Sequence, residues 1–375
     1  MAAGLALFGL VAIYSASNYS AAKDYSDEFF FVKKQAVSVC LGLAAMIFTA
    51  NFDYSKYKKI GLPALILSVV LLAAIFIPGL GVETYGAKRW IGVAGVTFQP
   101  SEIAKFAFVL FAAGYFSKKP DRVNSFVGIL PVLAAGGIIC LLIILEPNMS
   151  ITVCVGALMI GTLFAAGVKA RYIVSVLLPV IAAVPVLIIA EPYRLKRLSA
   201  FLDPWASPKG EGYQLLQSLY ALGSGGWFGV GLFNSRQKFE FLPFSESDFI
   251  LSVIGEELGF IGIIALFGAM FFLIYRGIKA AAGAKDFYGY MLASGITLVY
   301  AVQVAINALV VSGAIPPTGV PLPLISSGGT GLIMFLAAFG IVENISKQNV
   351  GYVPTISERL KLKGQKFSKK EKIVD

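Results

Sequence analysis

One carboxylate stands where it could take part in chemistry. Asp248 lies in the sequence Ser247-Asp248-Phe249-Ile250, at the point where a polar stretch gives way to a long apolar run. An acidic group at the mouth of a membrane-spanning segment is costly and marks a functional position by default, although some such acids only cap a helix or form an ion pair. A carboxylate in this setting can accept a proton from a reacting hydroxyl group.

Two further acids, Glu256 and Glu257, follow in the same apolar run. In a helix Glu256 would lie about 12 Å deeper than Asp248 and within about 80° of the same face, whereas Glu257 would point the opposite way. Asp248 is therefore the acid best placed for chemistry at the end of the helix. The chain has no histidine, which excludes serine-histidine triads and histidine-bound metal sites.

Basic residues accumulate in the polar stretch before Asp248. Residues 191–247 contain Arg194, Lys196, Arg197, Lys209, Arg236 and Lys238. A positive stretch of this kind predicts an anionic partner. The alternative is a solvated loop whose cations pair with nearby acids, namely Asp203, Glu211, Glu240 and Glu246.

The elements that must position these residues are membrane helices. Of the 375 residues, 57% are hydrophobic and only 14% are charged, too few to coat a soluble protein of this length. Because a spanning helix needs about 20 mostly apolar residues, the sequence predicts an all-α polytopic membrane protein with ten transmembrane helices. They centre on residues 1–16, 35–51, 61–80, 102–117, 126–145, 150–168, 173–190, 248–275, 288–312 and 329–346.

The distribution of lysine and arginine predicts the orientation. Placing both termini in the cytoplasm puts the basic clusters at 56–59, 118–122, 169–171 and 276–285 inside, and the large loop between helices 7 and 8, about 191–247, outside. Residues 1–346 would form the membrane domain, and 347–375 a basic cytoplasmic tail attracted to the anionic inner leaflet or simply solvated. The first span is short and lacks a basic leader, so we expect no cleavable signal peptide; a start upstream of Met1 would complete that helix.

Two more segments are too polar for simple connectors. In the first, Pro100 suits the first turn of a helix, and Glu102 and Lys105 stand three residues apart on one face, where they can pair at the membrane edge. The second, 316–329, contains four prolines, which a regular helix cannot accommodate. Irregular backbone near a membrane is tolerated where protein or a water-filled cavity surrounds it, so this segment predicts a cavity wall, with a rigid turn as the alternative.

The cysteines offer no chemistry of their own. Cys40, Cys140 and Cys154 all lie inside apolar runs without CxxC spacing. Neither a disulfide framework nor a zinc site is therefore predicted.

Four motif groups together identify a family. They are GAKRWIG followed by QPSEIAK, GYQLLQS with GSGGWFGVG, SDFILSVIGEELG, and PTGVPLPLISSGG. In this order they resemble the SEDS family (shape, elongation, division and sporulation), ten-span peptidoglycan polymerases that include RodA, FtsW and SpoVE. The resemblance begins in the first helix at Tyr14-Ser15-Ala16-Ser17 and extends to the last span, and it is closer to the FtsW/SpoVE branch than to the RodA branch.

The sequence departs from the family pattern in two places. Asn148 stands where many members carry an aspartate, so no acidic role passes to it. Phe244-Ser245-Glu246-Ser247 replaces the more usual lead-in to the aspartate, but Asp248 itself is retained.

The resemblance implies polymerisation of lipid II, an undecaprenyl-pyrophosphate disaccharide-pentapeptide, into glycan strands at the outer face of the bacterial cytoplasmic membrane during division or sporulation. Asp248 matches the family's catalytic aspartate and would act as a general base in an inverting transfer. The residues expected to bind substrate are Arg89, Glu102, Lys105, Arg194, Arg197, Gln214, Gln217, Ser218, Arg236, Lys238, Ser326 and Ser327.

The sequence contains no dedicated metal cage and predicts no organic cofactor. A divalent cation, Mg²⁺ or Mn²⁺, would bind together with the substrate pyrophosphate. The family also implies a partner, a single-pass class B penicillin-binding protein that supplies transpeptidation, together with other divisome or sporulation membrane proteins. No nucleic-acid partner is expected.

Two other classes of function remain open. A flippase or transporter of a lipid-linked cell-wall precursor would also need cations, intramembrane acids and broken helices. A non-catalytic scaffold for a septal complex would need no chemistry at Asp248. Incubation of the purified protein with lipid II in detergent, where no membrane sides exist, separates an enzyme from both.

Overall fold

The computed structural model describes residues 1–84, 87–93, 96–189 and 192–348. The first seven helices are α1 (Ala2–Tyr25), α2 (Phe30–Asn51), α3 (Tyr57–Ala74), α4 (Pro100–Lys118), α5 (Phe126–Leu145), α6 (Met149–Ala165) and α7 (Ala170–Ile189). The remaining five are α8 (Pro192–Leu202), α9 (Tyr213–Gly225), α10 (Ile250–Ala282), α11 (Phe287–Val311) and α12 (Gly329–Lys347). Short 3-10 turns occupy Tyr54–Lys56, Pro120–Asn124 and Pro204–Ala206.

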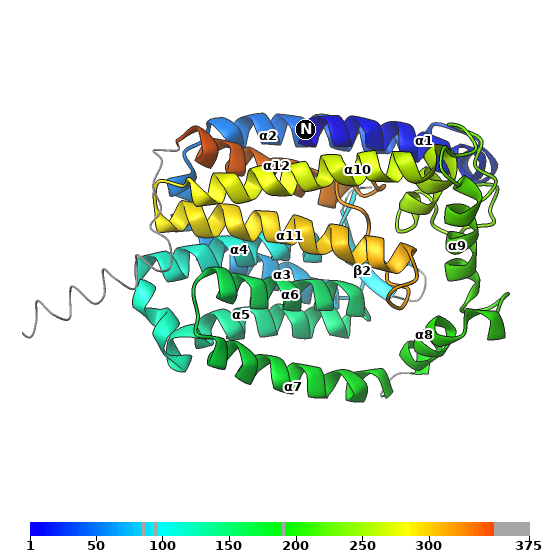
Figure 1. Cartoon of the computed structure of the whole chain (residues 1–375). Helices are drawn as coiled ribbons and strands as arrows, with labels where there is room; N and C mark the ends of the chain where they lie inside the picture. The colour runs from blue at the N-terminus through cyan, green and yellow to red at the C-terminus, as the bar shows by residue number, and fades with distance from the viewer. Residues whose placement is uncertain (85–86, 94–95, 190–191, 349–375) are drawn as a thin grey trace, which may run out of the picture.

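The helices form a bundle with α11 near its middle (Figure 1). On one side of α11 lie α1, α2, α10 and α12, and on the other lie α3, α4, α5, α6 and α7. Small residues let these helices approach closely, as is usual in membranes. A Cβ atom on Gly340 of α12, for example, would lie 2.3 Å from the carbonyl oxygen of Met46 on α2.

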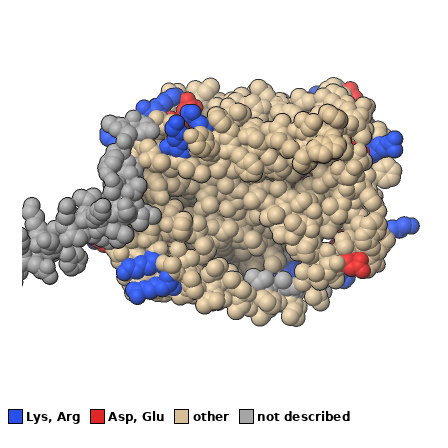
Figure 2. All heavy atoms as spheres, in the orientation of Figure 1, with Lys and Arg blue, Asp and Glu red and all other residues tan. Residues whose placement is uncertain are grey.

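The predicted membrane fold is confirmed. Among the described residues, seven helical segments are long and apolar enough to cross a bilayer, and they contain α1, α2, α3, α5, α10, α11 and α12. Figure 2 shows the lysine, arginine and acidic side chains of one face gathered toward the two ends, with a broad uncharged band between them. The helices α4, α6 and α7 coincide with the other predicted spans, so the number of ten spans stays a prediction. The basic tail beyond residue 348 lies outside the described residues.

A small sheet, which the sequence did not predict, precedes α4. Its strands are β1 (Gly81–Thr84), β2 (Ala87–Val93) and β3 (Val96–Phe98), paired antiparallel in the order β1-β2-β3. On β2, Ala87 and Ile91 are buried while Lys88 is exposed, in keeping with the alternation of side chains along a strand. Strands this short carry too little periodicity to be recognised within a polar connector. The sheet matters because β2 carries Arg89.

The helix α10 is interrupted at Gly259, which has φ 65° and ψ −168°. This backbone conformation belongs to glycine because a side chain would clash there. The break leaves an outer segment, 250–258, which begins next to Asp248, and an inner segment, 260–282. Asp248 thus lies next to the start of a short helix, which the break separates from the longer inner segment of α10.

The proline-rich segment between α11 and α12 is irregular and buried. It contains Val320, Leu322 and Leu324, whose exposed fractions are 1%, 1% and 2%. It also packs closely on α1, since a Cβ atom on Gly9 would lie 2.8 Å from the carbonyl oxygen of Ile325. Protein therefore surrounds this irregular backbone, as membrane depth would require; that the segment forms a cavity wall stays a prediction.

Candidate active site

Asp248 lies half-buried just before α10, held by an amide from α11. The Nδ2 atom of Asn307 donates to the carbonyl oxygen of Asp248 at 2.8 Å and to that of Val320 at 2.8 Å. One side chain therefore joins the start of α10 to the proline-rich segment. The carboxylate is also close to that segment, because a Cβ atom on Gly319 would lie 3.1 Å from Asp248 Oδ2.

Two further contacts join the proline-rich segment to the residues before Asp248. The hydroxyl of Ser326 donates to the carbonyl oxygen of Ser247 at 2.6 Å. The backbone N–H of Ser327 donates to the carbonyl oxygen of Glu246 at 2.9 Å. These predicted site residues thus lie beside Asp248, where they fix its backbone.

The surroundings of Asp248 adjust its proton affinity. Burial and then the nearby Glu246 carboxylate raise the pKa of Asp248 to about 7, while a hydrogen bond from Ser247 and the positive charges of Arg89 and Arg197 act in the opposite direction. A general base works best when its pKa lies near the operating pH. The pKa of Asp248 therefore lies in the range that such a role would use, and the role itself stays a prediction.

Two arginines reach this region from distant parts of the chain. On β2, Arg89 donates from Nε to the carbonyl oxygen of Glu146 at 3.4 Å and from Nη2 to that of Pro147, at the C-terminal end of α5. On α8, Arg197 donates from Nη1 to the carbonyl oxygen of Pro317 at 3.4 Å. Because both charges influence Asp248, the two predicted phosphate-binding arginines are brought to the same site.

Glu146 is a second buried acid beside Arg89. Its side chain is 1% exposed, and neither carboxyl oxygen has a hydrogen-bond partner among the described residues. Burial raises the pKa of Glu146 to about 8, although the charge of Arg89 opposes this. Glu146 is therefore mainly neutral at pH 7.

The predicted pair of Glu102 and Lys105 is confirmed, with 2.8 Å between Oε1 and Nζ. It is buried inside the bundle, where the two side chains are 4% and 0% exposed; its depth in the membrane stays a prediction. Lys105 also donates to Oε1 of Gln303 on α11 at 2.6 Å, and Gln303 donates to the carbonyl oxygen of Pro321 at 3.0 Å. Since Gln303 and Asn307 are one helical turn apart, polar contacts run along α11 from the ion pair to Asp248.

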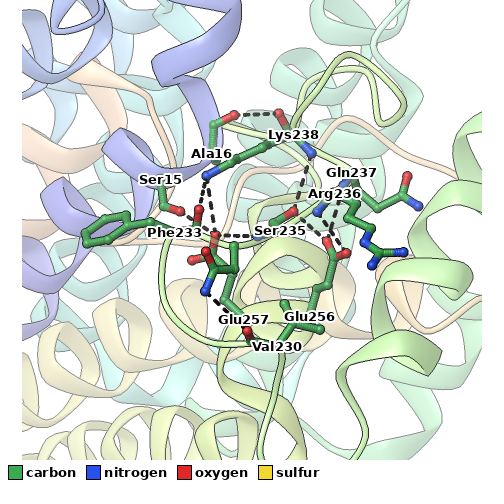
Figure 3. A network of polar contacts seen from close by, with 12 residues as sticks. Ser15, Ala16, Val230, Phe233, Ser235, Arg236, Gln237, Lys238, Glu256 and Glu257 are labelled. Carbon is green, nitrogen blue, oxygen red and sulfur yellow. Dashed lines mark hydrogen bonds and ion pairs between the residues drawn. The ribbon is translucent and has the colours of Figure 1, made fainter.

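Lys238 and Arg236 belong to a separate network (Figure 3). The Lys238 side chain is 4% exposed; its Nζ atom donates to the carbonyl oxygen of Phe233 at 2.5 Å and lies 4.0 Å from Glu257 Oε1. Arg236 is exposed, and its backbone N–H donates to Glu256. Lys238 thus makes its contacts inside the protein, whereas the side chain of Arg236 reaches the surface. A phosphate contact for either residue stays a prediction.

The other predicted binding residues lie on α8 and α9. Gln214 donates to the carbonyl oxygen of Pro243 at 3.2 Å. Ser218 is fully buried, 2.8 Å from the hydroxyl of Ser252 and 2.8 Å from the carbonyl oxygen of Val311. The two contacts of Ser218 hold α9, within the loop of residues 191–247 (the outer loop), against α10 and α11. Gln217 and Arg194 are half-buried on the same two helices.

The loop acids offered as partners for the loop cations have other contacts. Glu240 pairs with Lys23 of α1 at 2.6 Å. Asp203 accepts hydrogen bonds from the backbone N–H groups of Trp205 and Ala206. The Glu240 pair thus joins the loop to α1, whereas the contacts of Asp203 stay within the loop.

Sequence reasoning missed Gln303, Asn307 and Gly319. The two amides carried a signal, since polar side chains four residues apart within an apolar helix lie on one face and are costly unless paired. Asn307 Oδ1 and the Thr318 hydroxyl are buried without a hydrogen-bond partner among the described residues, so they can accept or donate to a substrate or water. The same part of the chain contains no group of three or more His, Cys, Asp or Glu residues that could hold a metal.

Comparisons with known proteins identify the family of this chain. The family model for FtsW, RodA and SpoVE, described as "Cell cycle protein", matches residues 1–351. The "Probable peptidoglycan glycosyltransferase FtsW" of Geobacter sp. (strain M18) is 38% identical over 352 residues, 94% of this chain and 96% of that protein. "Stage V sporulation protein E" of Bacillus subtilis (strain 168) is 40% identical over 351 residues, 92% of this chain and 94% of that protein.

A solved structure is also similar over almost the whole chain. It comes from a study of "Structural coordination of polymerization and crosslinking by a peptidoglycan synthase complex", with a TM-score of 0.74 and 27% identity. The match covers 92% of this chain and 97% of the other. The family inferred from the four motif groups is therefore confirmed: this chain belongs to the FtsW, RodA and SpoVE family of cell cycle proteins.

Proposed function

We propose that this protein is a peptidoglycan glycosyltransferase that polymerises lipid II into glycan strands at the outer face of the cytoplasmic membrane. The observation that carries the proposal is Asp248, a half-buried carboxyl group with a pKa of about 7 beside two arginines. The names of the curated relatives, which include peptidoglycan glycosyltransferase FtsW, support the reaction.

In this reaction the 4-hydroxyl group of one sugar attacks the anomeric carbon of another. The new carbon–oxygen bond forms as the bond to the lipid diphosphate breaks, and the hydroxyl proton passes to the carboxylate of Asp248. A direct displacement of this kind inverts the anomeric centre. A sugar hydroxyl is barely acidic, so the carboxylate must be positioned to take the proton as the bond forms.

The departing diphosphate carries negative charge, which Arg89 and Arg197 would stabilise. Fixed cations act more strongly in a partly dehydrated site than in water. A divalent ion, Mg²⁺ or Mn²⁺, would add positive charge to the diphosphate and would take its ligands mainly from the substrate. The side-chain oxygens of Asp248, Glu246 and Asn307 would be the protein groups able to contribute to holding such an ion.

The surroundings of the enzyme follow from the same proposal. The catalytic loop faces outward and both termini lie in the cytoplasm of a bacterial cell, as the distribution of basic residues favours. A class B penicillin-binding protein would crosslink the strands, and the similarity to a peptidoglycan synthase complex supports such a partner.

The test is to incubate the purified protein with lipid II in detergent. We expect glycan strands from the parent protein, and a rate lower by roughly 10²- to 10⁴-fold in Asp248→Asn and Asp248→Ala. Gel filtration and thermal unfolding of the same samples check that the variants remain folded. Unchanged polymerisation in a folded Asp248→Ala variant would refute the role of the carboxylate as the base.

The same assay separates the alternative functions. A flippase would give no polymer in detergent but would move lipid II across the bilayer of sealed vesicles. A scaffold would give neither product. Polymer formed by the parent protein in the absence of other proteins excludes both as the sole function.

A further inference from the structure

The break in α10 is joined to the outer loop by exchanged backbone hydrogen bonds. In a continuous helix, the carbonyl oxygens of Glu256 and Glu257 would accept from the N–H groups of Phe260 and Ile261. They accept instead from Val230 at 2.9 Å and Gly231 at 3.0 Å. The N–H groups of Phe260 and Ile261 donate instead to the carbonyl oxygens of residues 226 and 227, at 2.9 and 3.2 Å. The loop thereby satisfies the polar backbone groups that the break exposes.

Only glycine fits at this junction. A Cβ atom on Gly229 would lie 2.1 Å from the carbonyl oxygen of Glu257, and one on Gly259 would lie 2.3 Å from the nitrogen of Gly229. Both residues also have positive φ angles, 79° and 65°. The loop and the outer segment of α10 are therefore held in one arrangement.

The same two glutamates bind the loop a second time through their side chains (Figure 3). Glu256 uses both carboxylate oxygens: Oε1 accepts from the N–H of Arg236 at 3.0 Å, and Oε2 accepts from the hydroxyl of Ser235 and the N–H of Gln237. Glu257 uses one oxygen in these contacts: its Oε1 accepts from the N–H of Ser235 at 3.2 Å and from Ser15. Both carboxylates thus converge on the same turn of the loop.

The first helix completes this assembly. The hydroxyl of Ser15 on α1 donates to Glu257 at 2.5 Å, and the hydroxyl of Ser245, three residues before Asp248, donates to the carbonyl oxygen of Ala16 at 3.0 Å. Two adjacent residues of α1 therefore bind both Glu257, near the break in α10, and Ser245, in the chain that leads to Asp248.

We propose that Glu256 and Glu257 are positioning residues, which fasten the outer segment of α10 to the loop and to α1 so that Asp248 is held in its reactive place. They lie at the far end of the short helix that begins beside Asp248, and the break at Gly259 gives that helix no rigid continuation into the membrane. Instead, the carboxylates of Glu256 and Glu257 hold this short helix against the loop and α1. This inference rests on the proposed polymerase activity.

The two glutamates differ in a way that makes the inference testable. An amide has one acceptor oxygen, so Glu256→Gln must turn its NH₂ group toward a donor and lose at least one anchor. Glu257→Gln can keep both of its anchors through the single oxygen they share. It loses the negative charge near Lys238, which affects stability more than position.

The experiment measures kcat and KM for polymerisation of lipid II by the folded fraction of each variant in detergent. Because small misplacements of a catalytic group cost one to two orders of magnitude in rate, we expect kcat to fall by about tenfold or more in Glu256→Gln and Glu257→Ala, with KM almost unchanged. We expect Glu257→Gln to keep kcat within about threefold of the parent value and to melt at a lower temperature.

A control and a second measurement keep the outcomes distinct. Thr49→Val removes a buried hydrogen bond to Ala337 between α2 and α12, away from this network, and should lower the melting temperature without changing kcat. Hydrogen exchange in Glu256→Gln should rise together in residues 226–240 and 247–258. Parental kcat in folded Glu256→Gln, or an equal loss in Glu257→Gln and Glu257→Ala, would overturn the inference. An inactive parent protein would instead refute the proposed function.

Discussion

At the scale of single residues, the site depends on the proton affinity of one carboxyl group. Asp248 is the acid that sequence reasoning selected, and its surroundings explain why an aspartate can serve as a base near neutral pH. Burial and Glu246 raise its pKa, while Arg89 and Arg197 keep that pKa from rising further. In the proposed reaction, this pKa would leave the carboxylate available at pH 7 and still able to accept a proton from a sugar hydroxyl.

The close approach of Gly319 to this carboxylate gives the first prediction. A methyl group at this position would meet Asp248 Oδ2 at 3.1 Å, so Gly319→Ala should shift the carboxylate by a few tenths of an ångström. We expect kcat to fall by about tenfold or more with little change in melting temperature, because reactivity is more sensitive than stability to such a shift. The matched control is Gly156→Ala on α6, where no atom lies within 4 Å of the added methyl. Equal activity of the two variants would contradict the placement.

The second prediction concerns the amide that joins Asp248 to the proline-rich segment. Asn307→Ala removes both hydrogen bonds of Nδ2, so the segment would no longer be held over the carboxylate. More water would reach Asp248 and its pKa would fall, because burial is the main cause of its elevation. We expect a lower kcat and an acid limb of the pH–rate profile displaced to lower pH.

Asn344 provides the control for that experiment. It is also a buried asparagine, and it bonds to Ala50 and Tyr54 at the junction of α12 with α2 and the turn before α3. Asn344→Ala should cost about 1–3 kcal/mol of stability, as the loss of a buried hydrogen-bonding group usually does, without moving the pH–rate profile. A displaced profile in Asn344→Ala, or an unmoved one in Asn307→Ala, would count against the specific role of Asn307.

The sequence predicted part of this site and not the rest, for physical reasons. Asp248 and the pair of Glu102 and Lys105 were recognisable because charges within apolar runs are rare and costly. The engagement of Lys238 with Glu257 was hidden, because the two residues lie on separate elements and no helical spacing relates them. The same holds for Gly319, whose contact with Asp248 exists only after the proline-rich segment has packed.

At the scale of elements, the interrupted α10 is the feature that would position the proposed base, Asp248. The sequence predicted one long apolar helix from about residue 248, and the run of apolar residues gave no sign of the break at Gly259. A glycine in an apolar helix is common, so its φ of 65° depends on the loop that packs against it. The small sheet before α4 escaped prediction for a related reason, since its strands are stabilised by their mutual pairing.

The third prediction compares two glycines of α10. Gly259→Ala places a side chain in a left-handed conformation and within 2.3 Å of a backbone nitrogen, so stability should fall by about 1–3 kcal/mol or more. Gly268→Ala lies in the inner segment with nothing within 4 Å of the added methyl, and it should be neutral or stabilising by up to about 1 kcal/mol. Thermal unfolding in detergent measures both. Equal stability of the two variants would mean that the helix is continuous in solution.

At the scale of the whole molecule, the functional parts gather at one end of the bundle. Figure 1 shows α8, α9 and the loop before α10 at the end of the bundle opposite the C-terminal end of α12. The basic clusters that follow α2, α4 and α6 would then face the cytoplasm, as the positive-inside rule predicts. The bundle of apolar helices was predictable from composition, because a bilayer requires helices of this length; the orientation stays a prediction.

The fourth prediction tests that orientation. In a variant whose three cysteines are replaced by alanine, Lys209→Cys should react with a membrane-impermeant maleimide in intact cells, since this exposed residue lies in the outer loop. Lys119→Cys, which is also exposed and follows α4, should react only after the membrane is opened. The reverse pattern would place the loop in the cytoplasm, where a reaction at the outer face is impossible.

The most direct test of Asp248 as the base is the pH dependence of kcat for lipid II polymerisation. The carboxylate is the active form, so the rate should rise with pH through about 7 and then level off. Glu246→Gln removes a neighbouring negative charge that raises the pKa of Asp248, so its acid limb should move to lower pH. A parent profile that is flat between pH 5 and 8, or an acid limb that stays in place in Glu246→Gln, would contradict proton transfer to Asp248.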